Sequence, residues 1–408
     1  MHPVARQLIL VRFLRAIAQG ALAVDFTLYL SARHWNAPEI GLLLMSSGLF
    51  GALLSLAVGV MSDRVGRRVF LLIYETGLLA GTLAVVLGPT TWVVAAVAAL
   101  FGFGRGANGS SGPFAPAEQA WLAQSLPSAR RGAVFSLNAG MQFWGMGIGS
   151  LLAAVLPHMI PSATGAAAYL PLFLLNLLVA AINLLQIWLL QETKPGGFAE
   201  TEQVGAASPD ESVTRKENRA LALLTFVNMV NSLGVGLVAP LLPYWFSLRF
   251  GVGPEAIGPV YALTFFLTGA SSLVIGRISE RIGLIRSIVL PRLAGVVLLL
   301  AIPFAPSFAL AAAFYVVRSV LNRGSVGARQ AFGVGLVRDR RRGLASSLNA
   351  VSWNLPAALG PAVGGWLIGM GSLVWPFVLA AALQLVRRFR SSFPSGSYHN
   401  IPARSFRG

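Results

Sequence analysis

The stretch RGAVFSLNA at residues 131–139 returns as RGLASSLNA at residues 342–350, 211 positions later. A second pair lies upstream, where GVMSDRVG at residues 59–66 is echoed by GRISERIG at residues 276–283. Self-similarity at a long fixed offset marks repeated structural units. The chain is therefore predicted to consist of two related halves. In a membrane protein, parallel repeats place the functional site between the halves, near the bilayer midplane.

Composition predicts that these halves lie in a membrane. Of the 408 residues, 55% are hydrophobic and 11% are charged, whereas a soluble domain carries about 25% charged residues. The apolar residues form runs of roughly 18 to 25, long enough to cross a bilayer core. Helices are expected because a membrane segment must satisfy its own backbone hydrogen bonds. We predict an all-α membrane protein with twelve transmembrane helices in two pseudo-symmetric six-helix bundles. The expected spans are 9–32, 38–60, 69–88, 91–113, 133–157, 167–190, 219–246, 256–276, 284–304, 307–328, 344–368 and 371–387.

Polar segments divide the chain into four parts. The first bundle is expected over residues 1–192 and the second over residues 219–390. Residues 193–218 are rich in Glu, Thr, Ser, Gly and Lys, which is typical of a flexible cytoplasmic linker. The basic tail at residues 391–408 has too little apolar content to pack and is expected to be disordered.

The net charge of +17 has a topological explanation. Arginine and lysine gather in alternate loops, as in residues 64–68, 130–131 and 338–342, whereas the opposite loops carry Arg33 and Arg249. The positive-inside rule then places both termini in the cytoplasm and the protein in the cell (inner or plasma) membrane. The charge therefore does not indicate a nucleic-acid partner.

Several function classes lack their sequence signals. There are no cysteines and four scattered histidines, so neither a metal site nor a cofactor is expected. We find no nucleophile–base arrangement and no Walker-type phosphate loop, which argues against an enzyme and against direct ATP coupling. The expected partners are a small-molecule substrate, protons and the lipid bilayer, and the protein is expected to be a monomer.

One loop carries a specific resemblance. The sequence GVMSDRVGRR at residues 59–68 is similar to the signature G-x-x-x-D-R-x-G-R-R/K of the major facilitator superfamily, which also has two six-helix halves. The resemblance implies a twelve-span transporter, similar to the drug and metabolite exporter branches. It also implies a cytoplasmic latch that holds the halves together in the outward-open state. The residues in the latch positions are Gly59, Asp63, Arg64, Gly66 and Arg67. The alternative is that these arginines only set the topology.

A second signature is partial. Arg105 resembles the arginine of the family's R-x-x-x-G motif on span four, and Arg318 is its approximate counterpart on span ten. An arginine inside a membrane helix should face a cavity or a carboxylate, or else snorkel to the interface. The pattern G-P-x-x-G-G, which antiporter branches carry on span five, lies here on span eleven at residues 360–365. Span five has Gly145, Gly147 and Gly149 without the proline, so this motif does not support exchange, and close helix packing is expected there.

The candidate proton-coupling groups are Asp25, Arg105 and Glu75. If Arg12 and Arg15 snorkel to the inner interface, Asp25 falls near the middle of span one, where a buried carboxylate can bind and release protons. Alternatively, Asp25 lies near the outer surface and pairs with Arg33. Glu75 is the second candidate, or else part of a charge cluster near Arg67, and Glu118 is expected to be a gate or interface residue.

Amides and aromatic side chains in the spans suggest a substrate cavity. Buried amides are expected to turn away from lipid, either into a cavity or into hydrogen bonds between helices. Many aromatics with few charges suit an amphiphilic or lipophilic solute. Tyr244 and Trp245 are instead expected in the interfacial aromatic belt. The candidate cavity residues are Gln19, Phe26, Asn138, Gln142, Trp144, Asn228, Asn231, Arg318, Asn349 and Trp353.

These features favour a secondary active transporter that works by alternating access, most simply a proton-coupled exporter of a small amphiphilic or lipophilic solute. A nutrient symporter or facilitator of the same fold is the first alternative. A non-transporting membrane sensor or scaffold is the second.

Overall fold

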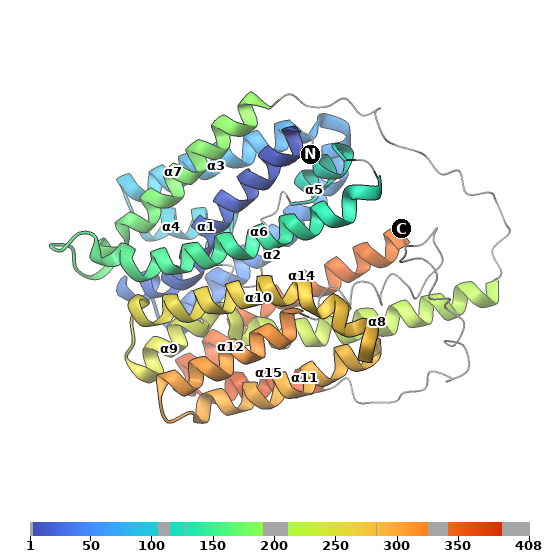
Figure 1. Ribbon diagram of the computed structural model, residues 1–408. Helices are drawn as coiled ribbons and strands as arrows, with labels where there is room; N and C mark the ends of the chain where they lie inside the picture. Colours follow the sequence, from blue (N-terminus) through green and yellow to red (C-terminus); the bar gives the residue numbers. More distant parts are fainter. Residues whose placement is uncertain are drawn as a thin grey trace.

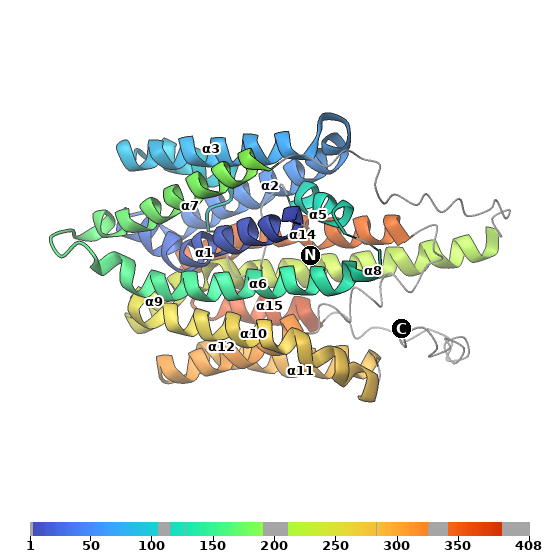
Figure 2. The same ribbon diagram turned by 45° about the horizontal axis from the view of Figure 1, so that its top comes forward.

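The computed structural model describes residues 3–104, 115–126, 128–190, 211–282, 284–324 and 342–385 (Figure 1). For helical residues 59–60, 63–65, 128–133, 211–221, 224, 272–282, 284–289 and 342–350, it describes the backbone alone. Every regular element in the described part of the chain is a helix. The helices lie with their long axes in roughly one direction, which Figure 2 shows from a second side. The predicted all-helical architecture is confirmed.

The elements of each half follow the predicted order. The first half contains α1 (Pro3–Ala32), α2 (Ala37–Val65), α3 (Arg67–Leu87), α4 (Thr91–Phe101), α5 (Ala115–Gln124), α6 (Ser128–Val155), η2 (Leu156–His158), η3 (Gly165–Tyr169) and α7 (Leu170–Leu189). The second half contains α8 (Glu211–Val238), η4 (Ala239–Leu241), α9 (Leu242–Phe250), α10 (Pro254–Ile282), α11 (Leu284–Ala301), η5 (Ile302–Phe304), α12 (Phe308–Gly324), α14 (Arg342–Gly369) and α15 (Trp375–Leu385).

Six helical stretches in the described residues are long and apolar enough to cross a membrane. Three shorter apolar stretches, such as Thr91–Phe101, accompany them. Large apolar side chains such as Trp92, 84% exposed, and Leu87, 78% exposed, cover the outside of the bundle. A surface of this kind is stable against lipid tails and costly in water. The protein is therefore a multi-pass membrane protein.

Local sequence signals set both ends of α2, at its short connections to α1 and to α3. Asn36 and Glu39 form a capping box at the start of α2, in which each side chain accepts a hydrogen bond from the other residue's backbone N–H. Gly66 joins α2 to α3 with a φ of 107°, a backbone conformation that favours glycine. Because these connections are short, the helices that they join run antiparallel.

The sequence repeat corresponds to a structural repeat. The repeated stretches lie at the start of α6 and of α14, which occupy equivalent places in the two halves. Gly149 on α6 packs on the backbone of Ile17 on α1, and Gly360, 211 positions later, packs on the backbone of Gly236 on α8. In both cases a Cβ atom would overlap the neighbouring helix. The glycines thus allow the close helix crossings that were predicted for span five.

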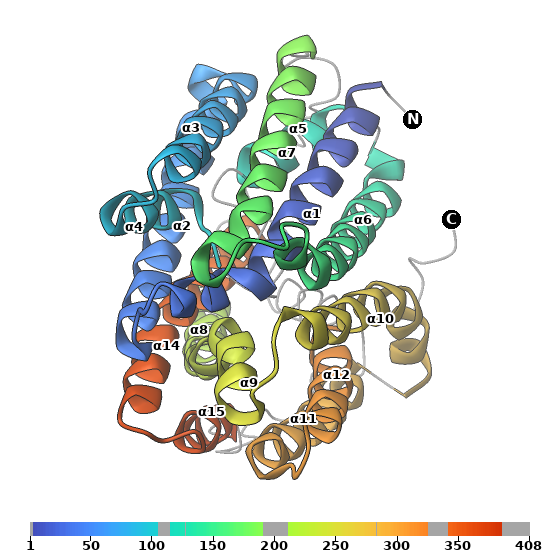
Figure 3. The ribbon, with the colours of Figure 1, turned by 90° about the vertical axis from the view of Figure 1, so that its left-hand side faces the viewer.

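The halves meet along two seams. Seen end-on in Figure 3, α2 lies beside α14 on one side of the molecule, and α6 lies beside α10 on the other. We call the end of the bundle that carries Arg33 and Arg249 the outer end, following the expected topology. Small residues make the first seam tight there, since Gly41 packs on the carbonyl of Pro361 and Gly365 on that of Ala37.

The second seam is also closed at its outer end. Gly258, in the second turn of α10, packs on Ser150 and Ala154 of α6. Deeper along the same seam, Phe266 packs edge-on against Trp144, with the ring centroids 5.8 Å apart. Because both seams are packed at the outer end, this conformation is closed to the outer side.

Two expectations differ from the structure. Helix α8 begins at Glu211, inside the segment that composition assigns to the linker. Tyr244 and Trp245 are 7% and 1% exposed, so they belong to the core and not to an aromatic belt. Trp245 donates a hydrogen bond to the carbonyl of Leu373 and packs 4.7 Å from the ring of Phe377. The aromatic-belt prediction was wrong because this tryptophan finds a backbone acceptor inside its own bundle.

Candidate functional site

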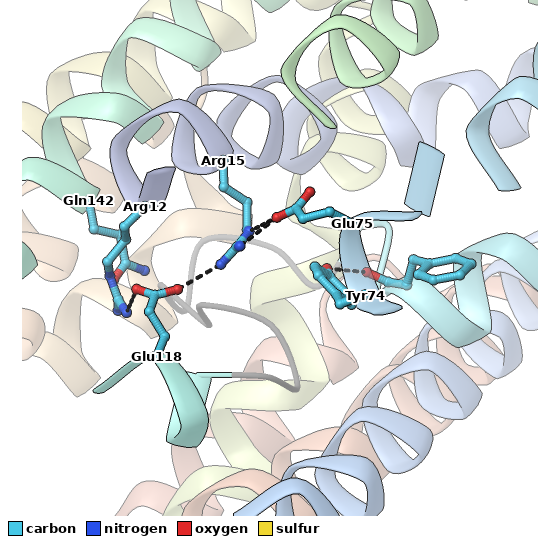
Figure 4. Close-up of polar contacts among 7 residues, drawn as sticks. Arg12, Arg15, Tyr74, Glu75, Glu118 and Gln142 are labelled. Carbon is cyan, nitrogen blue, oxygen red and sulfur yellow. Dashed lines mark hydrogen bonds and ion pairs between the residues drawn. The ribbon is translucent and has the colours of Figure 1, made fainter. Parts of the chain in front are cut away.

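A buried network of charged side chains lies inside the first half. Arg12 and Arg15 come from one face of α1, since residues three apart lie side by side on a helix. Glu75 comes from α3 and Glu118 from α5. Gln142 of α6 completes the group, and Figure 4 shows all five side chains turned toward one another. All five are at most 7% exposed.

Glu118 bridges the two arginines. Its Oε1 lies 3.1 Å from Nη1 of Arg12, and its Oε2 lies 2.7 Å from Nη1 of Arg15. Arg15 also donates from Nε to Oε1 of Glu75 at 3.0 Å, while Arg12 donates to the amide oxygen of Gln142. These contacts contain the three ion pairs found among the described residues. Two positive and two negative groups make the network neutral, which lowers the cost of burying each charge.

The network is close to the middle of α1. Arg15 is twelve residues after Pro3, which is about 18 Å along a helix of about 45 Å. The prediction that Arg12 and Arg15 snorkel to the inner interface was wrong, because carboxylates from α3 and α5 neutralise them inside the bundle. Glu75 therefore pairs with Arg15 and is 0% exposed. The sequence carried a partial signal: two arginines on one helix face, and an acid, Glu75, inside another span of the same half.

Removing Glu118 is expected to destabilise the protein strongly. Glu118→Ala leaves two buried guanidinium groups with one carboxylate between them, a loss of about 3–5 kcal/mol for a broken buried pair. The thermal unfolding midpoint of the purified protein in detergent should fall well below that of the wild type. Glu255→Ala is the matched control, because Glu255 is exposed in the first turn of α10 and its loss should cost less than about 1 kcal/mol. Equal midpoints for the two variants would contradict the paired network.

Asp25 occupies a different environment on the same helix. It lies ten residues beyond Arg15, about 15 Å along the axis, and therefore in the outer third of α1 rather than near its middle. It is 0% exposed, and neither carboxylate oxygen has a hydrogen-bond partner among the described residues. Arg33 does not pair with it, since its guanidinium binds the hydroxyl of Tyr29 and the carbonyl of Pro89. A buried carboxylate without a partner is costly in its charged form, so a proton is its natural partner.

The latch residues lie at the inner end of α2. Gly59, Asp63 and Arg64 are in the last two turns of this helix, where their side chains are outside the described part. Gly66 forms the turn and Arg67 begins α3, half-buried. Next to it, Arg68 donates from Nε to the carbonyl of Ile187 at 3.3 Å and so ties α3 to α7. The latch assignment remains a prediction.

The candidate cavity residues that the structure describes do not form one surface. Phe26 is fully buried in the core of the first half, 5.8 Å from the ring of Phe103. Gln142 holds Arg12, so here an amide joins helices and does not line an open space. Asn138, one turn before it, is also buried, and Gln19 is half-buried on α1. The expectation of a cavity therefore fails for Phe26 and Gln142 in this conformation, because first-half helices cover both.

The remaining candidates are distributed around the inter-half region and the second half. Trp144 is 54% exposed and contacts Phe266 of the second half. Asn231 and Arg318 are each 8% exposed, whereas Asn228 and Trp353 are half-buried. Arg105 and the side chain of Asn349 lie outside the described residues. Of this set, Trp144 joins the two halves most directly.

Comparisons with known proteins agree with this architecture. The family model of the Major Facilitator Superfamily matches residues 8–227 and 224–386. An uncharacterized membrane protein of Saccharomyces cerevisiae, YJR124C, is 23% identical over 324 residues, 72% of each chain. The uncharacterized MFS-type transporter YdeE of Escherichia coli is 28% identical over 144 residues, 35% of each chain.

Solved structures share the fold at low sequence identity. A point mutant of the nucleoside transporter NupG has a TM-score of 0.73 at 13% identity, with 94% of this chain and 97% of that chain covered. A bacterial homologue of the lysosomal transporter Spinster, inward-facing and occupied, has a TM-score of 0.71 at 14% identity and 93% and 95% coverage. A D-xylose-proton symporter has a TM-score of 0.68 at 11% identity, with 94% of each chain covered. The chain therefore belongs to the major facilitator superfamily, and it is a membrane transporter and not an enzyme.

Proposed function

We propose that this transporter is a proton-coupled exporter of a small amphiphilic or lipophilic solute, with Asp25 as the coupling group. The observation that carries the proposal is the burial of Asp25 with no hydrogen-bond partner among the described residues for either carboxylate oxygen. Arg15, in contrast, is held by two carboxylates deeper in the same helix. A proton can therefore enter and leave Asp25 without breaking an ion pair among the described residues.

Alternating access supplies the coupling. The two halves would rock about a central site, so that Asp25 meets the outer aqueous phase only after the outer seams open. Asp25 lies seven residues before the end of α1 at Ala32, about 10 Å from the outer end. Its burial by the closed seams would keep the proton bound until the halves rock outward. The network around Glu118 would hold α1 rigidly in place, and α1 carries both the arginines of this network and Asp25.

The character of the exposed and buried side chains supports an amphiphilic solute. Trp144 presents an aromatic face between the halves, and Asn231 offers an amide on α8. Sites for such solutes are largely apolar, with a few polar groups that fix orientation. Arg105 and Glu75 were the other coupling candidates. With Glu75 bound by Arg15, we place Asp25 ahead of it.

Proton flux in proteoliposomes tests the function directly. The purified protein is reconstituted with the pH dye pyranine inside, and a panel of aromatic acids, aromatic amines, uridine and D-xylose is added in turn. An exporter of the proposed kind moves protons in the direction opposite to the solute. Solute entry into the liposomes should therefore raise the internal pH that pyranine reports. Proton movement in the same direction as the solute would instead identify a symporter, as the D-xylose-proton symporter of the same fold is named.

Two further outcomes would overturn the proposal in different ways. Solute flux without any proton movement would identify a facilitator. Solute binding without flux would identify a sensor or scaffold on the same fold. Each measurement uses empty liposomes and a heat-inactivated preparation as controls, so that passive diffusion of lipophilic solutes is subtracted.

A further inference from the structure

Two arginines lie inside the second half, on α12. Arg318 is 8% exposed, and its Nε has no hydrogen-bond partner among the described residues. Arg323, half-buried and five positions later, places its guanidinium 5.2 Å from the ring centroid of Phe265 on α10, and its Nη1 is also unpartnered there. Five residues of helix separate the two by about 7.5 Å along the axis. Arg318 is buried and Arg323 is half-buried, so an anion bound near either guanidinium would offset the cost of withdrawing its charge from water.

The second half contains few acidic residues that could form ion pairs with Arg318 and Arg323. Between residues 219 and 390 the sequence contains Glu255, Glu280 and Asp339. Glu255 is exposed and accepts a hydrogen bond from the backbone N–H of Gly253. Glu280 follows Phe265 by fifteen positions on α10, which is about 22 Å along the helix and beyond the reach of a side chain. Asp339 lies outside the described residues, in a run of arginines directly before α14.

The two halves therefore differ in charge balance. In the first half, the arginines at 12 and 15 are matched by two buried glutamates at 2.7 to 3.1 Å. In the second half, neither Arg318 nor Arg323 forms an ion pair among the described residues. Burying an unpaired guanidinium is costly, and the cost falls when an anion binds. An unmatched pair of this kind fits a ligand that brings its own negative charge.

Aromatic side chains form the surroundings of these arginines. Tyr261 of α10 and Tyr315 of α12 pack with their ring centroids 5.2 Å apart, and Phe265 lies one turn beyond Tyr261. Phe266, the next residue along α10, contacts Trp144 of the first half. Helix α10 thus presents aromatic side chains both to Arg323 and to the seam between the halves. Aromatic faces accept flat apolar bodies, and the guanidinium groups accept anions.

We propose that Arg318 and Arg323, walled by Tyr261, Tyr315 and Phe265, form an anion-binding subsite for the transported solute. The solute would carry one anionic group, such as a carboxylate, sulfonate or phosphate monoester, on an aromatic or otherwise apolar body. This inference rests on the proposed function and specifies the solute class. It assigns charge selection to the second half and proton coupling to the first.

A matched set of naphthalene probes tests the subsite. Wild-type protein in neutral maltoside detergent is titrated with 2-naphthoate, 2-naphthalenemethanol or 2-naphthalenemethylamine, and its thermal unfolding midpoint is followed. A ligand that binds the folded form raises the midpoint as its concentration increases. We expect the anion to raise it most, the alcohol less and the ammonium least. No preference for the anion would overturn the proposal.

Three variants separate the subsite from general effects. Arg318→Gln should weaken naphthoate binding about ten- to hundredfold, the usual range for a lost charged hydrogen bond, and should abolish the preference for the anion. Its midpoint without probe should equal or exceed that of the wild type, because an unpaired buried charge has been removed. Arg318→Lys should retain part of the preference. Arg249→Gln is the control, since Arg249 is exposed at the outer end and its loss removes the same charge.

Further outcomes distinguish a lipid headgroup from a solute as the bound anion. They also separate failure of the subsite from failure of the proposed transport function. If phosphatidylglycerol added to the micelles removes the naphthoate shift in wild-type protein, the anion is a lipid headgroup and the assignment to a solute is overturned. Naphthoate binding without flux would leave the subsite standing and would refute the transport proposal. Proton-coupled flux of neutral or cationic probes, with no response to naphthoate, would refute the subsite alone.

Discussion

Gly365→Leu is expected to hold the outer end of the transporter open and to reduce transport at least tenfold. Gly365 packs on the carbonyl of Ala37, and a Cβ atom added there would lie 3.0 Å from the Cα of Gly41, so even a methyl group would overlap the opposite half. Overpacking of this kind costs about 1–3 kcal/mol. The cost falls on the closed state, because opening separates α14 from α2. The ratio of the outward-closed to the outward-open population should therefore fall roughly tenfold or more.

Labelling with a membrane-impermeant maleimide measures this change. The chain has no cysteine, so one introduced at Ala37, which is 4% exposed, gives no background. In the variant with Gly365→Leu, labelling at position 37 from the outer side should be faster by about the same factor as the population shift. The control is Gly140→Leu on α6, where an added Cβ atom has no neighbour within 4 Å. Unchanged labelling with Gly365→Leu would show that this seam is not the outer gate.

The sequence predicted the frame of the molecule well. The repeat at residues 131–139 and 342–350 identified α6 and α14 as equivalent helices, and the apolar runs located the spans. These features are local in sequence: a span must be apolar over its whole length, and a repeat keeps its pattern. The sequence also predicted that glycines would allow close helix packing. Which helix each glycine contacts was not predictable, because that depends on the arrangement of the bundle.

The predictions failed where a side chain's partner lies far away in the chain. Arg15 and Glu75 are sixty positions apart, and Arg12 and Glu118 still further, so the arginines of α1 were interpreted by the general rule for span ends. Because Arg12 and Arg15 do not lie at the inner interface, Asp25 lies further toward the outer end of α1 than predicted. Trp245 was misplaced for a similar reason, since its acceptor at Leu373 belongs to a distant loop.

The two halves differ in the charge of their buried groups that lack a hydrogen-bond partner in the described part of the chain. In the first half, Arg12 and Arg15 are neutralised, and Asp25 is a buried acid with no hydrogen-bond partner among the described residues. In the second half, Nε of Arg318 and Nη1 of Arg323 have no hydrogen-bond partner among the described residues. A proton and an anionic solute would therefore be drawn to different halves of one carrier. One rocking motion of the halves would then change the access of both Asp25 and the two arginines, without direct contact between them.

Asp25→Asn is expected to abolish uphill transport while leaving exchange intact. Asparagine has nearly the same shape but cannot release a proton, so a pH gradient should no longer drive solute accumulation, a loss of at least tenfold. The change breaks no ion pair among the described residues, since Asp25 has none there, and folding should be preserved. Solute counterflow at equal pH on both sides should stay within about threefold of the wild type, because rocking of the halves needs no net proton transfer.

The matched control is Glu39→Gln, which removes one negative charge at the outer end of α2. Glutamine also serves at this position of a capping box, so the helix start is kept, and pH-driven accumulation should be unchanged. Accumulation that persists in Asp25→Asn would transfer the coupling role to the carboxylates at 75 and 118. Loss of counterflow together with accumulation would make Asp25 a structural or solute-binding group. Protons drive this carrier through Asp25 only if accumulation is lost and counterflow remains.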